Sequence, residues 1–380
     1  MRFISKTLLA AGSAVVLLAA SGCAGTGTAA SGDPASGDSI TLGAVLPLTG
    51  ASATIGADQR RGIDLAVEQI NAAGGVLGKK LSVAVEDSQG TANSALDAAR
   101  KLVSVTKVPA VIGEYSSGVT VPVGTYLQEQ HVVHLNVGSS SPAIANIGNY
   151  SFSTIGLDTL ASSFTAQELI KARQKTAVVI APNNSYGEGV ATTLKAAYEQ
   201  LGGKISDSVL YTEGQTDYRA ELQRAKQSNP DVFVYSAYGQ EAATINKQAF
   251  ELGMTGTPWY GIYLTMCTGD SDPSVVEGQQ GMDVNYTGPD GSAYVAAYKE
   301  KFGQDLSSTY SAYAYDAVKL VARAIEDGKS AKADDIRSNL ANRNEAYAGV
   351  TGPIAFDAHN QRREQPYAVL SFTNGAIKTD

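Results

Sequence analysis

The chain has 380 residues, of which 37 are acidic and 29 are basic, so its formal net charge is −8 at pH 7. This length is sufficient for two domains of ordinary size, each with a substantial core. An acidic chain without a block of basic residues argues against nucleic acid as a partner.

The N-terminus has the layout of an export signal. Arg2 and Lys6 precede the apolar run 8–20, and two small residues follow it. The run is shorter than the roughly 20 apolar residues that a membrane-spanning helix needs, so residues 1–22 are predicted to be a signal peptide. Residues 23–38 have almost nothing to bury and are predicted to form a flexible tether.

The first residue after this signal is Cys23. The segment 20–23 resembles a bacterial lipobox, in which lipid is added to the thiol and cleavage makes the cysteine the new N-terminus. Ala20 stands where the lipobox usually has leucine, and the alternative is an ordinary signal peptide with an incidental cysteine. We expect a lipid anchor on Cys23 that holds an exported protein at the outer face of the cytoplasmic membrane. Cys267 then has no disulfide partner, and we expect a buried, inert thiol there.

From residue 39 onward, strand patterns alternate with helical patterns. The first half contains predicted strands at 40–46, 81–86, 108–113 and 132–136 and predicted helices at 61–71, 93–107 and 118–130. After residue 158, strands are predicted at 176–181, 205–210 and 232–236, and helices at 161–173, 187–201, 218–227, 241–252, 292–302 and 310–327. This rhythm predicts an α/β protein with two doubly wound lobes, whose parallel sheets are covered by helices on both faces. The ligand site is expected in the crevice at the carboxyl ends of the strands.

Catalytic motifs are scarce in this sequence. The glycine-rich segment 74–79 lacks the spacing of a phosphate-binding loop, and Ser116 and Ser117 come one position late for a nucleophile elbow. His131 and His134 flank an apolar strand and are interpreted as structural. We therefore predict no catalytic residue, metal or cofactor, and no enzymatic activity.

Polar residues follow the predicted strands of the first half. Ser117 opens a helix, where hydroxyl and backbone N–H groups suit a carboxylate, although this serine could equally serve only as a helix cap. Gly138 and Ser140 follow the next strand. Asp158 stands at the expected crossing between the lobes, where it could pair with a ligand's ammonium group or cap the following helix.

Tyrosines occur at strand ends in the second half. Tyr186 follows the strand at 176–181, and Tyr238 follows the strand at 232–236. Tyrosine has a flat apolar face and a hydrogen-bonding hydroxyl, which suits a small amphipathic ligand. Each position alone is as consistent with a structural role, and the prediction depends on several of them meeting in one crevice.

Five segments together resemble a known family. Segments 40–50 and 62–78 are similar to the opening of the type I periplasmic binding proteins, in the branch typified by the leucine/isoleucine/valine-binding protein. Segments 111–120, 185–189 and 352–357 continue the match in order, so the resemblance covers essentially the whole body after the tether.

The resemblance implies two lobes that are joined by three crossovers and close on a small ligand. The implied N-terminal lobe comprises 39–157 plus 288–350, and the C-terminal lobe comprises 158–287 plus 351–380. Members of the family deliver their ligand to an ATP-driven permease, so the resemblance implies an ABC importer as partner and no reaction.

The resemblance also implies roles for residues of the first lobe. Ser117 matches the serine that, with nearby backbone N–H groups, holds the ligand's α-carboxylate. Gly138 and Ser140 match a loop whose backbone carbonyl and hydroxyl bind the α-amino and carboxylate groups. Asp158 falls where the family keeps an aspartate near the ammonium group.

In the second lobe, Tyr186 matches a tyrosine that closes over the ligand, and Tyr238 matches another, with a register that could slip by one residue. Two positions depart from the family pattern. Tyr263 stands where amino-acid binders usually have a glutamate for the ammonium group, and Ile55 stands where an aromatic residue lines the side-chain pocket. Losing one carboxylate partner makes a neutral amide, urea or an aromatic acid more plausible as ligand, because a buried ammonium needs a compensating charge.

The function expected from these observations is that of a monomeric solute-binding lipoprotein, which captures an amino acid of branched-chain or related type for an ABC importer. The alternatives are a binding protein for urea, short amides or aromatic acids, and a ligand-sensing receptor or regulator of the same fold. An exported enzyme on an α/β scaffold is a third class, because a fold alone does not determine function.

Overall fold

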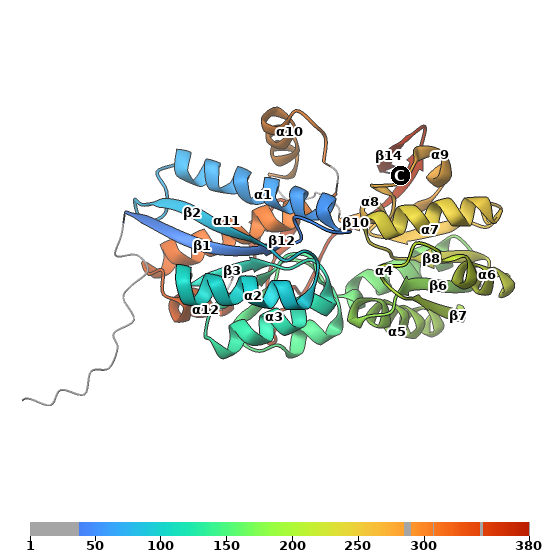
Figure 1. Cartoon of the computed structure of the whole chain (residues 1–380), viewed down its shortest axis with the longest axis horizontal. Helices are drawn as coiled ribbons and strands as arrows, with labels where there is room; N and C mark the ends of the chain where they lie inside the picture. The colour runs from blue at the N-terminus through green and yellow to red at the C-terminus, as the bar shows by residue number, and fades with distance from the viewer. Residues whose placement is uncertain (1–37, 285–289, 307, 343–344, 380) are drawn as a thin grey trace, which may run out of the picture. The chain divides into compact units, whose positions relative to one another are not determined.

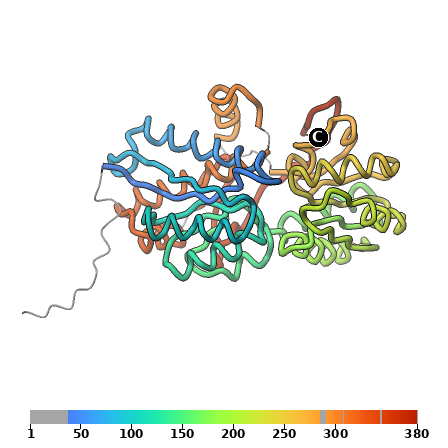
Figure 2. Tube along the Cα trace, viewed as in Figure 1, coloured from blue at the N-terminus to red at the C-terminus, as the bar shows by residue number. Residues whose placement is uncertain are grey.

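The computed structural model describes residues 38–284, 290–306, 308–342 and 345–379. All of them belong to one structural unit, Asp33–Asp380. Two main β-sheets with helices packed against them form this unit (Figures 1 and 2), which confirms the predicted α/β class with two doubly wound lobes. The predicted signal peptide, Cys23 and all but the last residue of the predicted tether lie outside the described residues.

The first sheet has five parallel strands in the order β2-β1-β3-β4-β5. They are β1 (Ser39–Leu46), β2 (Lys80–Asp87), β3 (Ala110–Gly113), β4 (Val133–Asn136) and β5 (Ser151–Ser153), the last of which was not predicted. The helices that pack with this sheet or on one another beside it are α1 (Ala53–Ala72), α2 (Ala92–Lys101), α3 (Ser117–Glu129), α10 (Gly291–Phe302), α11 (Tyr310–Gly328) and α12 (Ala333–Ala341).

Side-chain alternation along β1 explains how this sheet is covered on both faces. Ile40, Leu42, Ala44 and Leu46 are buried in the same core cluster as residues of α1 and α11. Val45 instead packs with residues of α2 and α3, which lie on the opposite side of the sheet (Figure 1). Successive side chains of a strand point to opposite faces, so a strand buried on both sides is apolar almost throughout.

The second sheet has seven strands in the order β14-β13-β10-β9-β8-β6-β7. They are β6 (Thr176–Pro182), β7 (Lys204–Tyr211), β8 (Val232–Tyr235), β9 (Trp259–Ile262), β10 (Gln280–Val284), β13 (Tyr367–Thr373) and β14 (Ala376–Thr379). Its helices are α4 (Asp158–Lys171), α5 (Ser185–Gln200), α6 (Arg219–Gln227), α7 (Gly239–Glu251), α8 (Leu264–Thr268) and α9 (Pro273–Val276). Neither β9 nor β10 was predicted. The C-terminal hairpin β13–β14, also not predicted, adds an antiparallel edge to the otherwise parallel sheet.

Two helix boundaries differ from the sequence prediction by more than three residues. The helix predicted at 61–71 begins at Ala53, so α1 includes an additional N-terminal stretch. The helix predicted at 93–107 is regular only to Lys101, where a π-helical turn, Leu102–Thr106, begins. Lys107 then ends the helix with a left-handed backbone, at φ 57°. Apolar spacing alone does not show where such a turn replaces the regular helix.

The chain passes between the two sheets after β5, after β10 and after the small hairpin β11 (Tyr347–Gly349) and β12 (Gly352–Ile354). Arg362 ties two of these connections together, since its guanidinium donates to the backbone oxygens of Thr154, Thr351 and Pro353 at 2.6–3.0 Å. The three crossovers are thus present, and the exact lobe boundaries stay a prediction.

Candidate functional site

The loop after β3 is held by a buried carboxylate. Glu114 accepts hydrogen bonds from the Ser88 hydroxyl at 2.5 Å and from the backbone N–H groups of Tyr115 at 2.7 Å and Ser116 at 3.0 Å. Burial raises the pKa of Glu114, and these bonds partly offset that effect. Gly113 precedes it with φ 133°, where a side chain would collide with the Val45 carbonyl oxygen at 2.1 Å. This loop places Tyr115 just beyond the carboxyl end of β3, and α3 begins at Ser117.

The loop after β4 is held by Asn136. Its side-chain oxygen accepts from the N–H groups of Gly138 and Ser139, and its amide nitrogen donates to the Ser139 carbonyl. A Cβ atom on Gly138 would lie 2.8 Å from the Cα atom of Tyr115, so the two loops approach too closely for any larger residue. Sequence analysis assigned Gly138 to the ligand, and the structure adds a packing requirement for glycine at this position.

The predicted first-lobe residues are brought together by these two loops. The buried Ser117 hydroxyl accepts a hydrogen bond from the Ser141 N–H at 3.3 Å. The Asp158 N–H donates to the Ser140 carbonyl at 2.6 Å. Ser117, Ser140 and Asp158 therefore lie beside one another, with Gly138 in the same loop as Ser140.

Asp158 is fully buried at the start of α4. Neither of its carboxylate oxygens has a hydrogen-bond partner within 3.5 Å among the described residues. Burial raises its pKa to about 7, and the nearby Ser140 hydroxyl partly counteracts that rise. A buried carboxylate without a partner is costly, so this position suits a cationic group or a hydrogen-bond donor from outside the protein.

The predicted second-lobe tyrosines meet the first lobe through their rings. Tyr186 donates to or accepts from the Ser236 hydroxyl, and its ring stacks on Tyr238 at 5.5 Å. Tyr238 also lies 5.2 Å from the ring of Tyr115, in an edge-to-face arrangement. Asn184 caps α5 by accepting from the Tyr186 and Gly187 N–H groups. Residues that follow β3, β6 and β8 are thus in contact.

Tyr263 lies on the same side, between β9 and α8. Its backbone is left-handed, at φ 60° and ψ 72°, which is uncommon for a large side chain. Its ring is 6.1 Å from Tyr310 and 6.5 Å from Tyr367, and Tyr310 in turn is 5.1 Å from Tyr115. Burial raises the pKa of Tyr263, and the neighbouring tyrosines and Asp158 add smaller contributions in the same direction.

We name the linked rings the tyrosine cluster, which consists of Tyr115, Tyr186, Tyr238, Tyr263, Tyr310 and Tyr367. Tyr115, Tyr310 and Tyr367 were not among the ligand residues predicted from the sequence. Tyr310 opens α11, where it reads as a core residue of the helix, and Tyr367 starts the unpredicted β13. The sequence offered only its composition as a signal for such a cluster, since the chain has 19 tyrosines and 8 phenylalanines.

Other predicted residues have simpler surroundings. Ile55 is buried in the first turn of α1, and Cys267 is buried in α8, as expected. The Cys267 thiol donates to the Ile262 carbonyl at 3.3 Å, and burial raises its pKa to about 12, which makes it unreactive. His134 lies between the Ser151 hydroxyl and the Gly113 carbonyl, and burial lowers its pKa to about 4. These contacts support the structural interpretation of His134.

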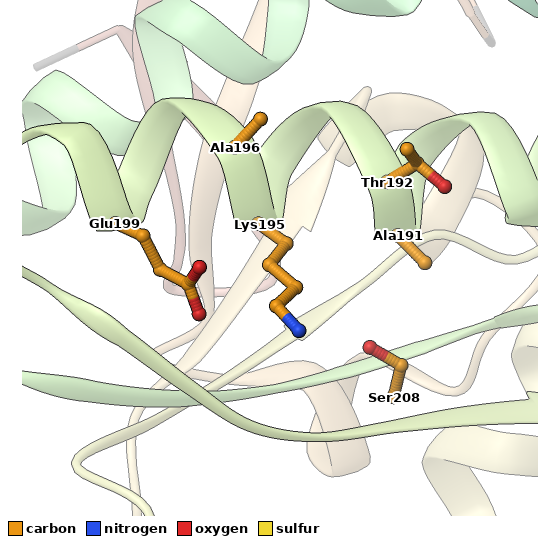
Figure 3. A pocket seen from close by; sticks show the side chains of 6 residues that line it. All are labelled: Ala191, Thr192, Lys195, Ala196, Glu199 and Ser208. Carbon is orange, nitrogen blue, oxygen red and sulfur yellow. The ribbon is translucent and has the colours of Figure 1, made fainter.

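A separate hollow lies between α5 and β7 (Figure 3). Its lining comprises Ala191, Thr192, Lys195, Ala196, Glu199 and Ser208. None of the sequence-predicted ligand residues is among them. In the described part of the chain, no group of three or more His, Cys, Asp or Glu residues could hold a metal ion. Nor does any described helix combine the length and apolar character needed to cross a membrane.

Comparison with known proteins identifies the family. The family model described as periplasmic binding protein matches residues 39–376. A leucine-, isoleucine-, valine-, threonine- and alanine-binding protein of Pseudomonas aeruginosa is 28% identical over 346 residues, which cover 88% of this chain and 90% of that protein.

Solved structures agree with this assignment. A branched-chain amino acid transporter substrate-binding protein from Streptococcus pneumoniae, in complex with isoleucine, is 26% identical with a TM-score of 0.79, covering 90% of this chain and 99% of that one. A solute-binding protein of an ABC transporter from Rhodopseudomonas palustris, in complex with 3,4-dihydroxybenzoic acid, shares the fold at 19% identity with a TM-score of 0.80, covering 90% and 95% of the two chains. The chain belongs to the periplasmic binding protein family, as a type I member similar to the leucine/isoleucine/valine-binding proteins.

Proposed function

We propose that this protein captures an amino acid, or a similar small polar compound, and delivers it to the membrane permease of an ABC importer. The observation that carries the proposal is the buried carboxylate of Asp158, whose oxygens have no partner among the described residues. It lies beside Ser140, and Ser117 at the N-terminus of α3 is joined to the same loop. A carboxylate next to a helix N-terminus matches the two opposite charges of an α-amino acid.

In this proposal the ligand's carboxylate binds the Ser117 hydroxyl and the first N–H groups of α3. Its ammonium group binds Asp158 together with Ser140 and the backbone at Gly138. Tyr186, Tyr238 and Tyr263 cover the ligand from the second lobe.

The proposed lobes follow the sequence prediction. The N-terminal lobe comprises 39–157 plus 288–350, and the C-terminal lobe comprises 158–287 plus 351–380. The lobes separate and close at their three connections.

Delivery to a permease from outside the cytoplasm requires export and retention. We propose that residues 1–22 are removed and that lipid on Cys23 anchors a monomer at the outer face of the membrane, without any enzymatic activity.

Relatives include a protein named as a binder of five amino acids and one solved with 3,4-dihydroxybenzoic acid. The replacement of a carboxylate by Tyr263 favours a second candidate, a binding protein for urea, short amides or aromatic acids.

The test is a thermal-shift screen of the purified protein, followed by calorimetric titration of the compounds that stabilise it. The panel contains the twenty amino acids, urea, short amides and aromatic acids. A ligand at 100 times its Kd adds about 2.7 kcal/mol to the free energy of unfolding, which is easily detected. Stabilisation by an amino acid supports the first candidate, whereas stabilisation only by neutral or aromatic compounds supports the second.

Two variants test the assigned residues. Ser117→Ala and Asp158→Ala are each expected to weaken binding by roughly 10-fold to 100-fold, because each removes a hydrogen bond to a charged group. Ser163→Ala is the matched control, since the Ser163 hydroxyl is exposed and donates within α4 to the Thr159 carbonyl. Unchanged affinity in both site variants would contradict the assignment, and hydrolysis of a bound amide or ester would contradict the absence of activity.

A further inference from the structure

We propose that the ligand carries its own hydrogen-bonding group, a hydroxyl or a carboxamide, on the part that faces Tyr115, Tyr263 and Tyr367. Purely aliphatic amino acids are then weak ligands. This inference rests on the proposed function and specifies the substrate class of the same site. It departs from the leucine, isoleucine and valine that stand in the names of the relatives.

Three buried tyrosine hydroxyl groups support this proposal. The hydroxyl oxygens of Tyr115, Tyr263 and Tyr367 are shielded from solvent, and none has a hydrogen-bond partner within 3.5 Å among the described residues. Tyr115 is 2% exposed and Tyr263 is fully buried, so solvent at the surface does not satisfy them. Buried tyrosine hydroxyls usually find a partner, so a hydroxyl without one can accept a partner that a ligand supplies.

Three tyrosines in or beside the cluster do have partners within the protein. The Tyr186 hydroxyl pairs with Ser236, the Tyr310 hydroxyl donates to the Met266 sulfur at 3.4 Å, and the Tyr313 hydroxyl accepts from Gln365 at 2.7 Å. Buried tyrosine hydroxyls without a partner in the described part of the chain also occur away from the site, at Tyr211, Tyr218, Tyr260 and Tyr294. What distinguishes Tyr115, Tyr263 and Tyr367 is that they belong to the tyrosine cluster beside the proposed ligand residues.

All three hydroxyls belong to residues in the surroundings of the proposed ammonium partner. A Cβ atom on Gly156, two residues before Asp158, would lie 3.0 Å from the Tyr367 hydroxyl, the Tyr263 ring is 6.5 Å from the Tyr367 ring, and Tyr115 lies in the loop that contacts Gly138. The Tyr263 hydroxyl is near enough to Tyr367 to counteract part of the pKa rise that burial causes there. Even if those two hydroxyls paired with each other, the bond would use only one of their two donors, so the second donor and the Tyr115 hydroxyl would remain for a ligand.

A site of this kind discriminates against ligands that cannot form hydrogen bonds. An aliphatic side chain seals these hydroxyls from water without pairing them, and each unpaired group weakens binding. A side chain of the same shape that carries a hydroxyl or carboxamide pairs them. We expect the polar member of an isosteric pair to bind roughly 10-fold to 100-fold more tightly than the apolar member.

The experiment is calorimetric titration of the purified protein with three isosteric pairs, asparagine and leucine, threonine and valine, and tyrosine and phenylalanine. Tighter binding of the polar member in the pair that binds supports the inference. Tighter binding of leucine, valine or phenylalanine overturns it and leaves the proposed function standing. Absence of binding by all six, and by the wider panel of the thermal-shift screen, overturns the inference and the proposed function together.

Removing single hydroxyls identifies the groups responsible. In Tyr263→Phe, Tyr115→Phe and Tyr367→Phe, the preference for the polar member is expected to fall by roughly 10-fold in at least one variant, while the apolar member binds equally or better. Tyr260→Phe is the matched control, because the Tyr260 hydroxyl is also buried and unpaired but lies near the amino end of β9, at the opposite edge of the sheet. An unchanged preference in all three site variants would overturn the assignment of these hydroxyls.

Discussion

The raised pKa of Asp158 predicts that ligand affinity depends on pH. In the protein without ligand, burial raises this pKa from 3.8 to about 7. Below pH 7 the carboxyl group is therefore protonated, and an ammonium ligand has to displace that proton before an ion pair forms. Each pH unit below 7 then weakens binding about tenfold, so Kd at pH 5 should be about 100-fold higher than at pH 8.

The assay is calorimetric titration of an amino-acid ligand at pH 5, 6, 7 and 8, in buffers of different ionisation enthalpy, so that proton release is counted directly. About one proton should be released per ligand bound at pH 5, and almost none at pH 8. Asp158→Asn is the control, since it should bind more weakly at every pH and lose most of the dependence. The variant also separates Asp158 from Asp316, whose pKa burial raises to about 6. A Kd that does not change from pH 5 to pH 8 would refute the reasoning.

Three further predictions concern other parts of the chain. Glu114→Ala should weaken ligand binding about tenfold and lower Tm, because the N–H groups of Tyr115 and Ser116 lose their acceptor. Glu114→Gln should retain most of the affinity and most of the thermal stability. Unchanged ligand affinity in Glu114→Ala would contradict this positioning role. Because burial lowers the His134 pKa from 6.5 to about 4, the free energy of unfolding in urea should fall by about 3 kcal/mol as pH decreases from 6.5 to 4, and His134→Gln should flatten that decline. Cys23→Ser in the full-length chain should move the protein from the membrane fraction to the soluble fraction, and retention in the membrane would exclude the lipid anchor.

The fold class was predictable because several strands in each half are short apolar runs that alternate with helical patterns. β6 is apolar along almost its whole length, since it lies between β8 and β7 and helices cover the sheet. The C-terminal strand β13 was missed for the opposite reason. It is only partly buried over most of its length, and its partner strand β10 is far away in the sequence. A local pattern cannot show such a partner.

The site was predictable only in part. Ser117, Gly138, Asp158 and Tyr186 could be proposed from the sequence because they follow strands or stand at the crossing between the sheets, and their roles toward a ligand stay predictions. Tyr310 was not found, because a tyrosine at the start of a core helix gives the same local pattern whether or not its ring meets Tyr115 and Tyr263. Contacts of that kind depend on how two halves of the chain come together.

Hydrogen bonding separates two kinds of buried polar residue at the edges of these sheets. Glu114, Asn136 and Asp283 are fully buried, and each makes several hydrogen bonds to neighbouring loops, so their energetic cost is met by the protein itself. Asp158 and the Tyr115 hydroxyl are buried to the same degree and lack such partners. Because an unpaired buried group disfavours the arrangement that buries it, we expect a ligand that pairs these groups to stabilise the contact between Tyr115 and Tyr238. We therefore expect closing of the lobes to be coupled to the chemistry of the ligand, and a compound that fits the space without pairing these atoms should bind without stabilising the closed arrangement.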